Sequence, residues 1–174
     1  MSTIKVPVQG SLEVIDNFLN KEDLNTLENY LLNPNFPWYF NHGVLTPEYS
    51  KSNPMDFQFV HTFYDKYAPS SAHIEALSSL LTAIKPSALI RIKANLNPIA
   101  PKQVEHGYHV DFDFTCKTAV FYVNTNNGYT KFKTGEIVNS VANRLVVFDS
   151  NMFHTGSTTT DSFARVLINL NYFK

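Results

Sequence analysis

The hydrophobic pattern of this chain changes at about residue 87 from a helical repeat to an alternating one, which restricts the folds open to it. Residues 90–96 are apolar at even positions and polar at odd positions. Alternation with period two is typical of strands that bury one face. Residues 118–124, 144–149 and 164–173 also have strand character, and Asn126-Asn127-Gly128 is a strong turn signal. We therefore predict several short strands in the C-terminal half.

Two amphipathic helices are predicted before these strands. The first covers residues 21–33, with Asn20 as its N-cap, and the second covers residues 71–85 and stops at Pro86. Their apolar stripes, which we assign to core packing, are Leu24, Leu27 and Leu31 in the first and Ile74, Leu77, Leu81 and Ile84 in the second. Helices followed by strands indicate an α+β, mainly β chain, in which an antiparallel sandwich or barrel carries the helices on one outer face.

The segment 36–69 between the two helices is rich in proline, asparagine and aromatic residues. We expect a strand at 57–63 and loop over much of the remainder. Loops at the mouth of a barrel commonly carry recognition, so Trp38, Tyr39 and Tyr49 either contact substrate or cap the hydrophobic core.

Length, charge and cysteine content narrow the classes of function. The 174 residues suit a single domain, 1–174, and a net charge of −1 provides no basic face for nucleic acid. Cys116 is the only cysteine, which excludes an internal disulfide, and residues 1–10 lack the pattern of a secretory signal. Both features predict a cytoplasmic protein. The apolar stretches are too short to cross a membrane.

The segment 106–113 carries the strongest chemical signal. On a strand, residues i and i+2 point to the same face about 6.5–7 Å apart, so His109 and Asp111 can approach one metal ion. His154 is the best third ligand, because it follows the buried-looking strand 145–148 and precedes a polar turn. Two histidines and one carboxylate leave coordination positions open, as in non-haem Fe(II) oxygenases. A His-x-Asp pair alone, however, occurs by chance in many proteins.

Arg165 lies at the start of a strongly apolar strand. The faces of that strand are Ala164, Val166, Ile168, Leu170 and Tyr172 on one side and Arg165, Leu167, Asn169 and Asn171 on the other. An unpaired buried charge is very costly, so Arg165 needs an anionic partner. That partner is either one of the chain's own carboxylates or a bound dicarboxylate gripped by the guanidinium.

The order of these motifs resembles the Fe(II)/2-oxoglutarate-dependent oxygenases, especially the prolyl-4-hydroxylase-like branch, over residues 88–173. The supporting segments are 121–124, similar to an aromatic-Tyr-Leu-Asn strand, 128–132, similar to a Gly-rich hairpin, and 143–148, similar to the strand before the distal histidine. The resemblance implies a double-stranded β-helix, a jelly-roll barrel with the N-terminal helices packed on one face.

The same resemblance implies roles for individual residues. His109, Asp111 and His154 would be the iron ligands, and Arg165 would bind the distal carboxylate of 2-oxoglutarate. The other cosubstrate-pocket residues that it implies are Tyr122, Asn169 and Asn95. Where many relatives carry Tyr-Pro before the His-x-Asp motif, this chain has Asn97-Pro98, and Asn127-Gly128 replaces a doubled glycine of the hairpin.

The remaining histidines and Asp113 receive lesser roles. Further ligands would close the positions that oxygen and 2-oxoglutarate need, so His106 and Asp113 are expected to support the site from outside or to lie at the surface. His61 and His73 are expected to be structural or exposed, and His42 has some chance of facing substrate.

The implied reaction is hydroxylation with Fe(II), 2-oxoglutarate and O2, releasing succinate and CO2. The substrate would be a protein side chain, an amino acid or a small molecule, and the oligomeric state stays open. Two other classes compete. A cupin-like metal-binding protein has no need of Arg165 as a dicarboxylate clamp, and a non-catalytic jelly-roll binding module has no need of the complete set of three metal ligands.

Overall fold

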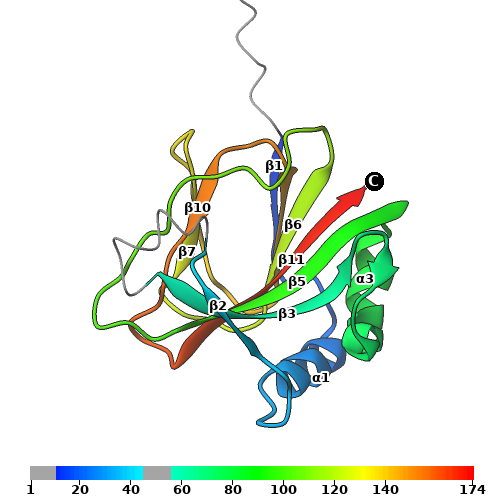
Figure 1. Ribbon diagram of the computed structural model, residues 1–174, viewed down its shortest axis with the longest axis horizontal. Helices are drawn as coiled ribbons and strands as arrows, with labels where there is room; N and C mark the ends of the chain where they lie inside the picture. Colours follow the sequence, from blue (N-terminus) through cyan, green and yellow to red (C-terminus); the bar gives the residue numbers. More distant parts are fainter. Residues whose placement is uncertain (1–10, 45–55) are drawn as a thin grey trace, which may run out of the picture.

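Two β-sheets face each other in this computed structural model, which describes residues 11–44 and 56–174 (Figure 1). The major sheet has the order β1-β9-β6-β11-β5-β3-β2, with β4 paired to β3, and the minor sheet has the order β10-β7-β8. The major strands are β1 (Leu12–Ile15), β2 (Tyr39–His42), β3 (Phe57–Asp65), β4 (Ala68–Pro69), β5 (Ala88–Pro98), β6 (Lys117–Tyr122), β9 (Arg144–Asp149) and β11 (Ala164–Phe173). The minor strands are β7 (Tyr129–Phe132), β8 (Ile137–Asn139) and β10 (His154–Gly156).

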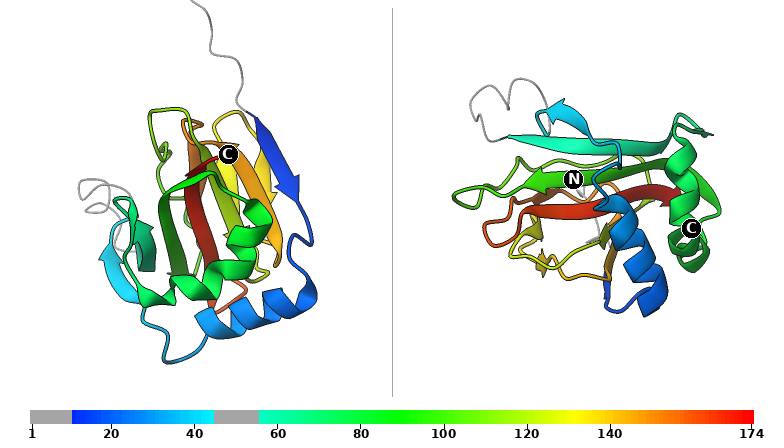
Figure 2. Two further views of the ribbon diagram at one scale, coloured as in Figure 1. Left: turned by 90° about the vertical axis from the view of Figure 1, so that its right-hand side faces the viewer. Right: turned by 90° about the horizontal axis from the view of Figure 1, so that it is seen from below.

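The long strand β11 lies in the middle of the major sheet, antiparallel to β5 on one side and to β6 on the other. Helices α1 (Lys21–Leu31) and α3 (Ser78–Ile84) cover the outer face of this sheet, away from the minor sheet (Figures 1 and 2). The mainly β, double-stranded β-helix with helices on one face is therefore confirmed, as are the predicted strands that became β9 and β11.

Helix α1 begins as predicted after Asn20, whose side-chain oxygen accepts a hydrogen bond from the backbone N–H of Asp23 at 2.9 Å. The second predicted helix is wrong as a single element. It is divided into a 3₁₀ helix, η1 (Ala72–Leu77), followed by α3. Leu77 of the predicted stripe is fully buried, and Ile74, Leu81 and Ile84 pack partly buried against the core. Leu80, outside the predicted stripe, is also fully buried, since a 3₁₀ helix turns further per residue than an α-helix and shifts the buried face.

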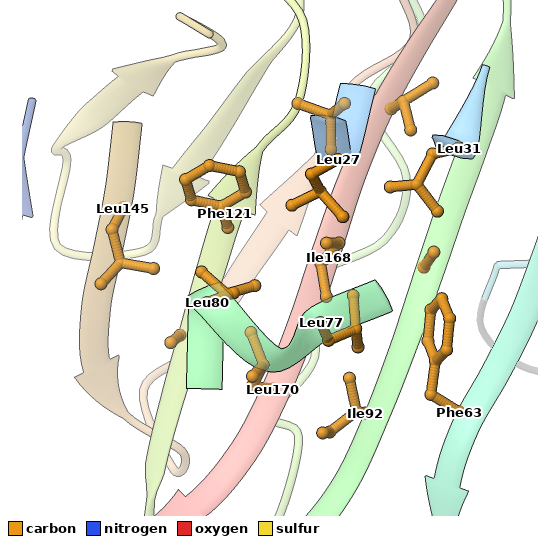
Figure 3. Packing of buried hydrophobic residues seen from close by; sticks show 14 of the residues in the cluster. Leu27, Leu31, Phe63, Leu77, Leu80, Ile92, Phe121, Leu145, Ile168 and Leu170 are labelled. Atoms are coloured by element: carbon orange, nitrogen blue, oxygen red, sulfur yellow. The ribbon is translucent and has the colours of Figure 1, made fainter. Parts of the chain in front are cut away.

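The main hydrophobic core lies between the helices and the outer face of the major sheet. In Figure 3, Leu27, Leu77 and Leu80 from the helices pack over Ile168 and Leu170 of β11. A second, smaller cluster fills part of the space between the sheets, and its members are Val120, Tyr122, Phe132, Val138, Val146, Phe148 and Leu167. Strand β11 thus supplies one face to the core and the other to the interior of the barrel.

The turn at Asn126-Asn127-Gly128 does not join two paired strands. Strand β6 pairs with β9 and β11, whereas β7 belongs to the minor sheet and pairs with β8 and β10. The turn therefore carries the chain from one sheet to the other. The hairpin of this region is β7–β8, and its connection contains Gly135 at a φ of 112°, a conformation that favours glycine.

The aromatic segment is more regular than predicted. Within it, β3 pairs with β5 and β2 with β3, so strand replaces part of the expected loop. Trp38 packs partly buried against the main core, whereas Tyr39 is 61% exposed. Tyr49 lies outside the described residues. In the part of the chain that the structure describes, no helix is both long and apolar enough to cross a membrane.

Candidate metal centre

The backbone of His109 is paired with that of His154. We predicted that His109 lies in a regular strand, and this is wrong. His109 forms an isolated antiparallel bridge with His154 of β10. The N–H of each residue donates to the carbonyl oxygen of the other at 2.9 Å. Directly opposed residues of an antiparallel pair project to the same face, so both imidazoles point the same way. Their ring centroids are 4.5 Å apart.

The three predicted metal ligands lie together. Candidate ligand atoms of His109, Asp111 and His154 are all within 4.8 Å of one another. Nδ1 of His109 lies 3.2 Å from the carbonyl oxygen of Gly107, and Nδ1 of His154 lies 3.0 Å from that of Met152. A carbonyl oxygen only accepts, so each Nδ1 carries the proton and each Nε2 keeps a free lone pair.

The charge states of these side chains also suit a divalent metal. Burial, together with the neighbouring His154, lowers the pKa of His109 to about 4, so its ring is neutral near pH 7. Burial alone would raise the pKa of Asp111. The charges of His154 and Arg91, with hydrogen bonds from Asn171 and Thr118, instead lower it to about 2. The set therefore offers the neutral imidazole of His109, the imidazole of His154 and the carboxylate of Asp111, which are the ligand types of Fe(II) sites with two histidines and one carboxylate.

Asp111 is held by a dense set of donors. Arg91 Nη2 lies 3.2 Å from Oδ1. The donors to Oδ2 are Thr118 Oγ1 at 2.8 Å, Asn171 Nδ2 at 2.9 Å and Asn169 Nδ2 at 3.3 Å. Such hydrogen bonds fix the orientation of a metal-binding carboxylate. The sequence had indicated only Asn169 among these residues. Arg91, Thr118 and Asn171 looked like ordinary polar positions of alternating strands, although Asn171 shares its strand face with Asn169.

Arg165 is buried at the other end of the same cavity and has no ion-pair partner among residues 11–44 and 56–174. Its Nε donates to Ser140 Oγ at 2.8 Å and its Nη2 donates to Thr130 Oγ1 at 3.2 Å. The guanidinium carbon lies 5.4 Å from the centre of the Tyr122 ring. The alternative of a structural ion pair with the chain's own carboxylates is therefore not met in this part of the structure.

Two glycines make room for the Arg165 side chain. A Cβ at Gly128 would lie 2.5 Å from Arg165 Cδ, a clash, and a Cβ at Gly156 would lie 3.4 Å from Nη1, an ordinary contact. The Gly128 turn signal, noted in the sequence, thus marks a place where the backbone passes so close to Arg165 that a Cβ would clash.

The other predicted pocket residues lie in different positions. The Tyr122 hydroxyl donates to Thr130 Oγ1 at 2.7 Å, so this fully buried tyrosine reaches Arg165 through Thr130. Asn95 and Asn169 line the cavity directly. The Oδ1 atoms of both are buried without a hydrogen-bond partner among the described residues. Unpartnered buried oxygens are costly, and these two are available to accept hydrogen bonds from a ligand.

The remaining histidines do not join the three-residue group. His106 is buried, with Nδ1 2.7 Å from Asp56 Oδ1, and it lines the cavity as a supporting residue. His61 contacts Pro37 and Ser71, and His73 contacts Tyr30. His42 is exposed beside Phe40. Asp113 is also exposed, at a separate position. The buried Asp56–His106 pair was not foreseen, because 49 residues separate the two positions in the sequence.

The two facing sheets form a double-stranded β-helix, and His109, Asp111 and His154 lie together in the cavity between them. The sequence matches no protein-family model and no curated protein. In solved structures, the fold is similar to a prolyl hydroxylase from Trichoplax adhaerens, determined in complex with a peptide fragment of the hypoxia inducible factor oxygen degradation domain. The TM-score is 0.68 and the identity 14%, over 93% of this chain and 83% of that one.

Two further solved structures have the same architecture. One is an oxidoreductase of the 2OG-Fe(II) oxygenase family from Burkholderia pseudomallei, with a TM-score of 0.64 and 11% identity over 93% of this chain and 85% of that one. The other is the epimerase SnoN in complex with Fe3+, alpha ketoglutarate and nogalamycin RO, with a TM-score of 0.67 and 12% identity over 95% and 79% of the two chains. At these identities the likeness establishes the fold.

Proposed function

We propose that this chain is an Fe(II)- and 2-oxoglutarate-dependent oxygenase that hydroxylates its substrate and releases succinate and CO2. One observation carries the proposal. The group of His109, Asp111 and His154 opens into one cavity between the two sheets, together with the guanidinium of Arg165, which has no ion-pair partner among the described residues. A metal site alone would fit many proteins, but a buried cation without an anion beside it calls for an anionic cosubstrate.

The residues present fit both groups. Two imidazoles whose Nδ1 atoms face carbonyl oxygens, together with an ionised, well-anchored carboxylate, are the donor set that Fe(II) takes while keeping coordination positions open. The cradle around Arg165, with Thr130 and Ser140 at its edge, fits the distal carboxylate of 2-oxoglutarate. When bound, iron and 2-oxoglutarate supply the activation of O2 and the oxidising power for attack on a C–H bond.

The chain itself contributes binding, orientation and exclusion of water. Arg91, Thr118 and Asn171 keep Asp111 ionised and fixed in one orientation. Arg165, which lines the same cavity as the three metal-binding residues, would hold the distal carboxylate of the cosubstrate and so orient it. Asn97, where many relatives carry tyrosine, lines the same cavity, and its Nδ2 donates to Gln58 Oε1 at 3.5 Å.

The same proposal covers the extent of the domain, the class of substrate and the location in the cell. One domain, 1–174, carries the whole site, and the substrate is a small molecule or a peptide. We place the protein in the cytoplasm, where Cys116, a free buried thiol, stays reduced. A cupin-like protein with another metal and a binding module without catalysis are the functions that experiment must exclude.

Anaerobic addition of Fe(II) and 2-oxoglutarate tests the proposal. We expect the visible charge-transfer band of the chelate and, after admission of air, slow succinate formation. In Arg165→Ala the loss of a buried charge-assisted contact, about 2–5 kcal/mol, should weaken 2-oxoglutarate binding at least about tenfold while iron stays bound. A wild-type protein that binds iron without the band would be a metalloprotein of another class. Unchanged 2-oxoglutarate affinity in Arg165→Ala would remove that residue from the cosubstrate site.

A further inference from the structure

The cavity is lined by more cationic than anionic side chains. Arg91, Lys93 and Arg165 line it, and Asp111 is the one acidic side chain in its described lining. Fe(II) and 2-oxoglutarate carry equal and opposite charges, so their joint binding would leave this excess of positive charge unchanged. Arg91 is already paired with Asp111, and Arg165 is assigned to the cosubstrate. Lys93 is therefore the cation of the lining to which neither a described carboxylate nor the cosubstrate has been assigned as a partner.

The register of the major sheet places Lys93 near the metal-binding residues. Lys93 on β5 lies directly opposite Asn169 on β11, and opposed side chains of an antiparallel pair share one face. Asn169 in turn donates to Asp111 at 3.3 Å. Arg165 lies opposite Asn97, which is four residues or about 13 Å further along β5. The two cations thus occupy opposite ends of the site.

Lys93 has no partner of its own. It is half-buried and forms no hydrogen bond or ion pair with any residue that the structure describes. Burial and the neighbouring Arg91 lower the pKa of its ammonium group to about 8, which Asp111 only partly offsets. An ammonium group held beside another cation is stabilised by a bound anion. The alternative is that the long side chain simply reaches past the cavity to water.

We propose that Lys93 binds an oxyanion of the substrate, a carboxylate or a phosphate, and so selects small anionic molecules over neutral ones. The inference rests on the proposed oxygenase function. The unpartnered Oδ1 atoms of Asn95 and Asn169 on the same cavity wall accept hydrogen bonds from an N–H or O–H group near that anion. A free α-amino acid combines both kinds of group, whereas an internal peptide residue has no backbone oxyanion.

The test uses the full chain loaded anaerobically with Fe(II) and 2-oxoglutarate. Two kinds of anionic probe, the free L-amino acids and inorganic phosphate, and the amino acid C-amides as neutralised counterparts are titrated while the charge-transfer band is followed. We expect at least one anionic probe to shift the band. Where that probe is an amino acid, its C-amide should bind at least tenfold more weakly. A shift of the band by amino acids but not by phosphate would indicate a carboxylate of the substrate, and a shift by phosphate alone would indicate a phosphate group.

Variants then assign the effect to Lys93. Lys93→Met should weaken the anionic probe at least tenfold, Lys93→Arg should retain most of the affinity, and the exposed Lys102→Met should behave as wild type. The 2-oxoglutarate affinity of Lys93→Met should remain within twofold of wild type. The inference is overturned if no anion shifts the band, if amides bind equally well, or if Lys93→Met has no effect or weakens 2-oxoglutarate itself. Failure of the chelate band to form in wild type would instead refute the oxygenase function.

Discussion

His109 and His154 exchange two backbone hydrogen bonds of 2.9 Å, although 45 positions separate them in the chain. This pairing brings both imidazoles to one face, and each ring has a carbonyl oxygen at its Nδ1. The geometry of two of the three proposed ligands therefore depends on the backbone of the barrel. A substitution of either side chain should remove a ligand without removing the bridge.

His154→Ala is expected to abolish tight Fe(II) binding, because His109 and Asp111 alone hold a labile divalent ion poorly. Iron content after anaerobic loading and desalting measures the effect. His42→Ala, at an exposed position outside the group of three candidate ligands, is the matched control and should load as wild type does. Equal iron content in His154→Ala and wild type would show that His154 is not a ligand.

Gly128→Ala is expected to weaken 2-oxoglutarate binding at least about tenfold while iron remains bound. The new Cβ would lie 2.5 Å from Arg165 Cδ and 2.7 Å from Asn126 Oδ1, so we expect the arginine side chain to be displaced from its present position. Gly156→Ala is the control, because its Cβ would meet Arg165 only at 3.4 Å, and a smaller loss is expected. Titration of the charge-transfer band measures both affinities. If the two variants bind 2-oxoglutarate equally, close packing around Arg165 does not determine cosubstrate binding.

The iron-free protein should lose thermal stability as the pH falls from 6.5 towards 4. The pKa of His109 falls from 6.5 to about 4 on folding, so in this window the unfolded chain takes up a proton that the folded chain does not. Acid therefore favours unfolding, and the pKa of Asp111, lowered to about 2, extends the effect to lower pH. Melting temperatures across this range test the prediction. His109→Gln should have a shallower dependence on pH, and an unchanged slope would contradict the assigned cause.

Tyr39→Ala should reduce substrate-coupled turnover but spare slow uncoupled succinate formation and the melting temperature. Its side chain is 61% exposed on β2, away from the metal-binding strands. Trp38→Ala is the contrasting variant, because Trp38 packs against the main core and donates to the carbonyl oxygen of Leu31 at 3.2 Å. It should lower the melting temperature. If Tyr39→Ala also unfolds early, the exposed face of β2 is structural and recognition lies elsewhere.

Local patterns were sufficient for the parts of the site that lie along single strands. The alternation around Arg165 correctly separated the core face of β11 from the cavity face, because side chains of a strand alternate whatever its neighbours are. Lys93 and Arg91 follow the same alternation, yet their importance was missed. It depends on which strand lies beside β5, and the sequence does not contain that information in any short segment.

The same limit explains the errors. Asn126-Asn127-Gly128 has the composition of a hairpin turn, but whether the flanking strands pair is decided by competition among β6, β9 and β11. The division of the second helix likewise depends on how Leu77 and Leu80 fit onto the sheet. Contacts between distant segments, such as Asp56 with His106, had no signal that a single sequence could provide.

Strand β11 presents the packed core on one side and Arg165, Asn169 and Asn171 on the other. Insertion or deletion of a single residue within it would exchange the two sides, placing the guanidinium against leucines and isoleucines. A shift of this strand by one residue therefore disturbs the hydrophobic core and the site together. Loss of cosubstrate binding and loss of the folded state should coincide, because both depend on the alternation of side chains along the same strand.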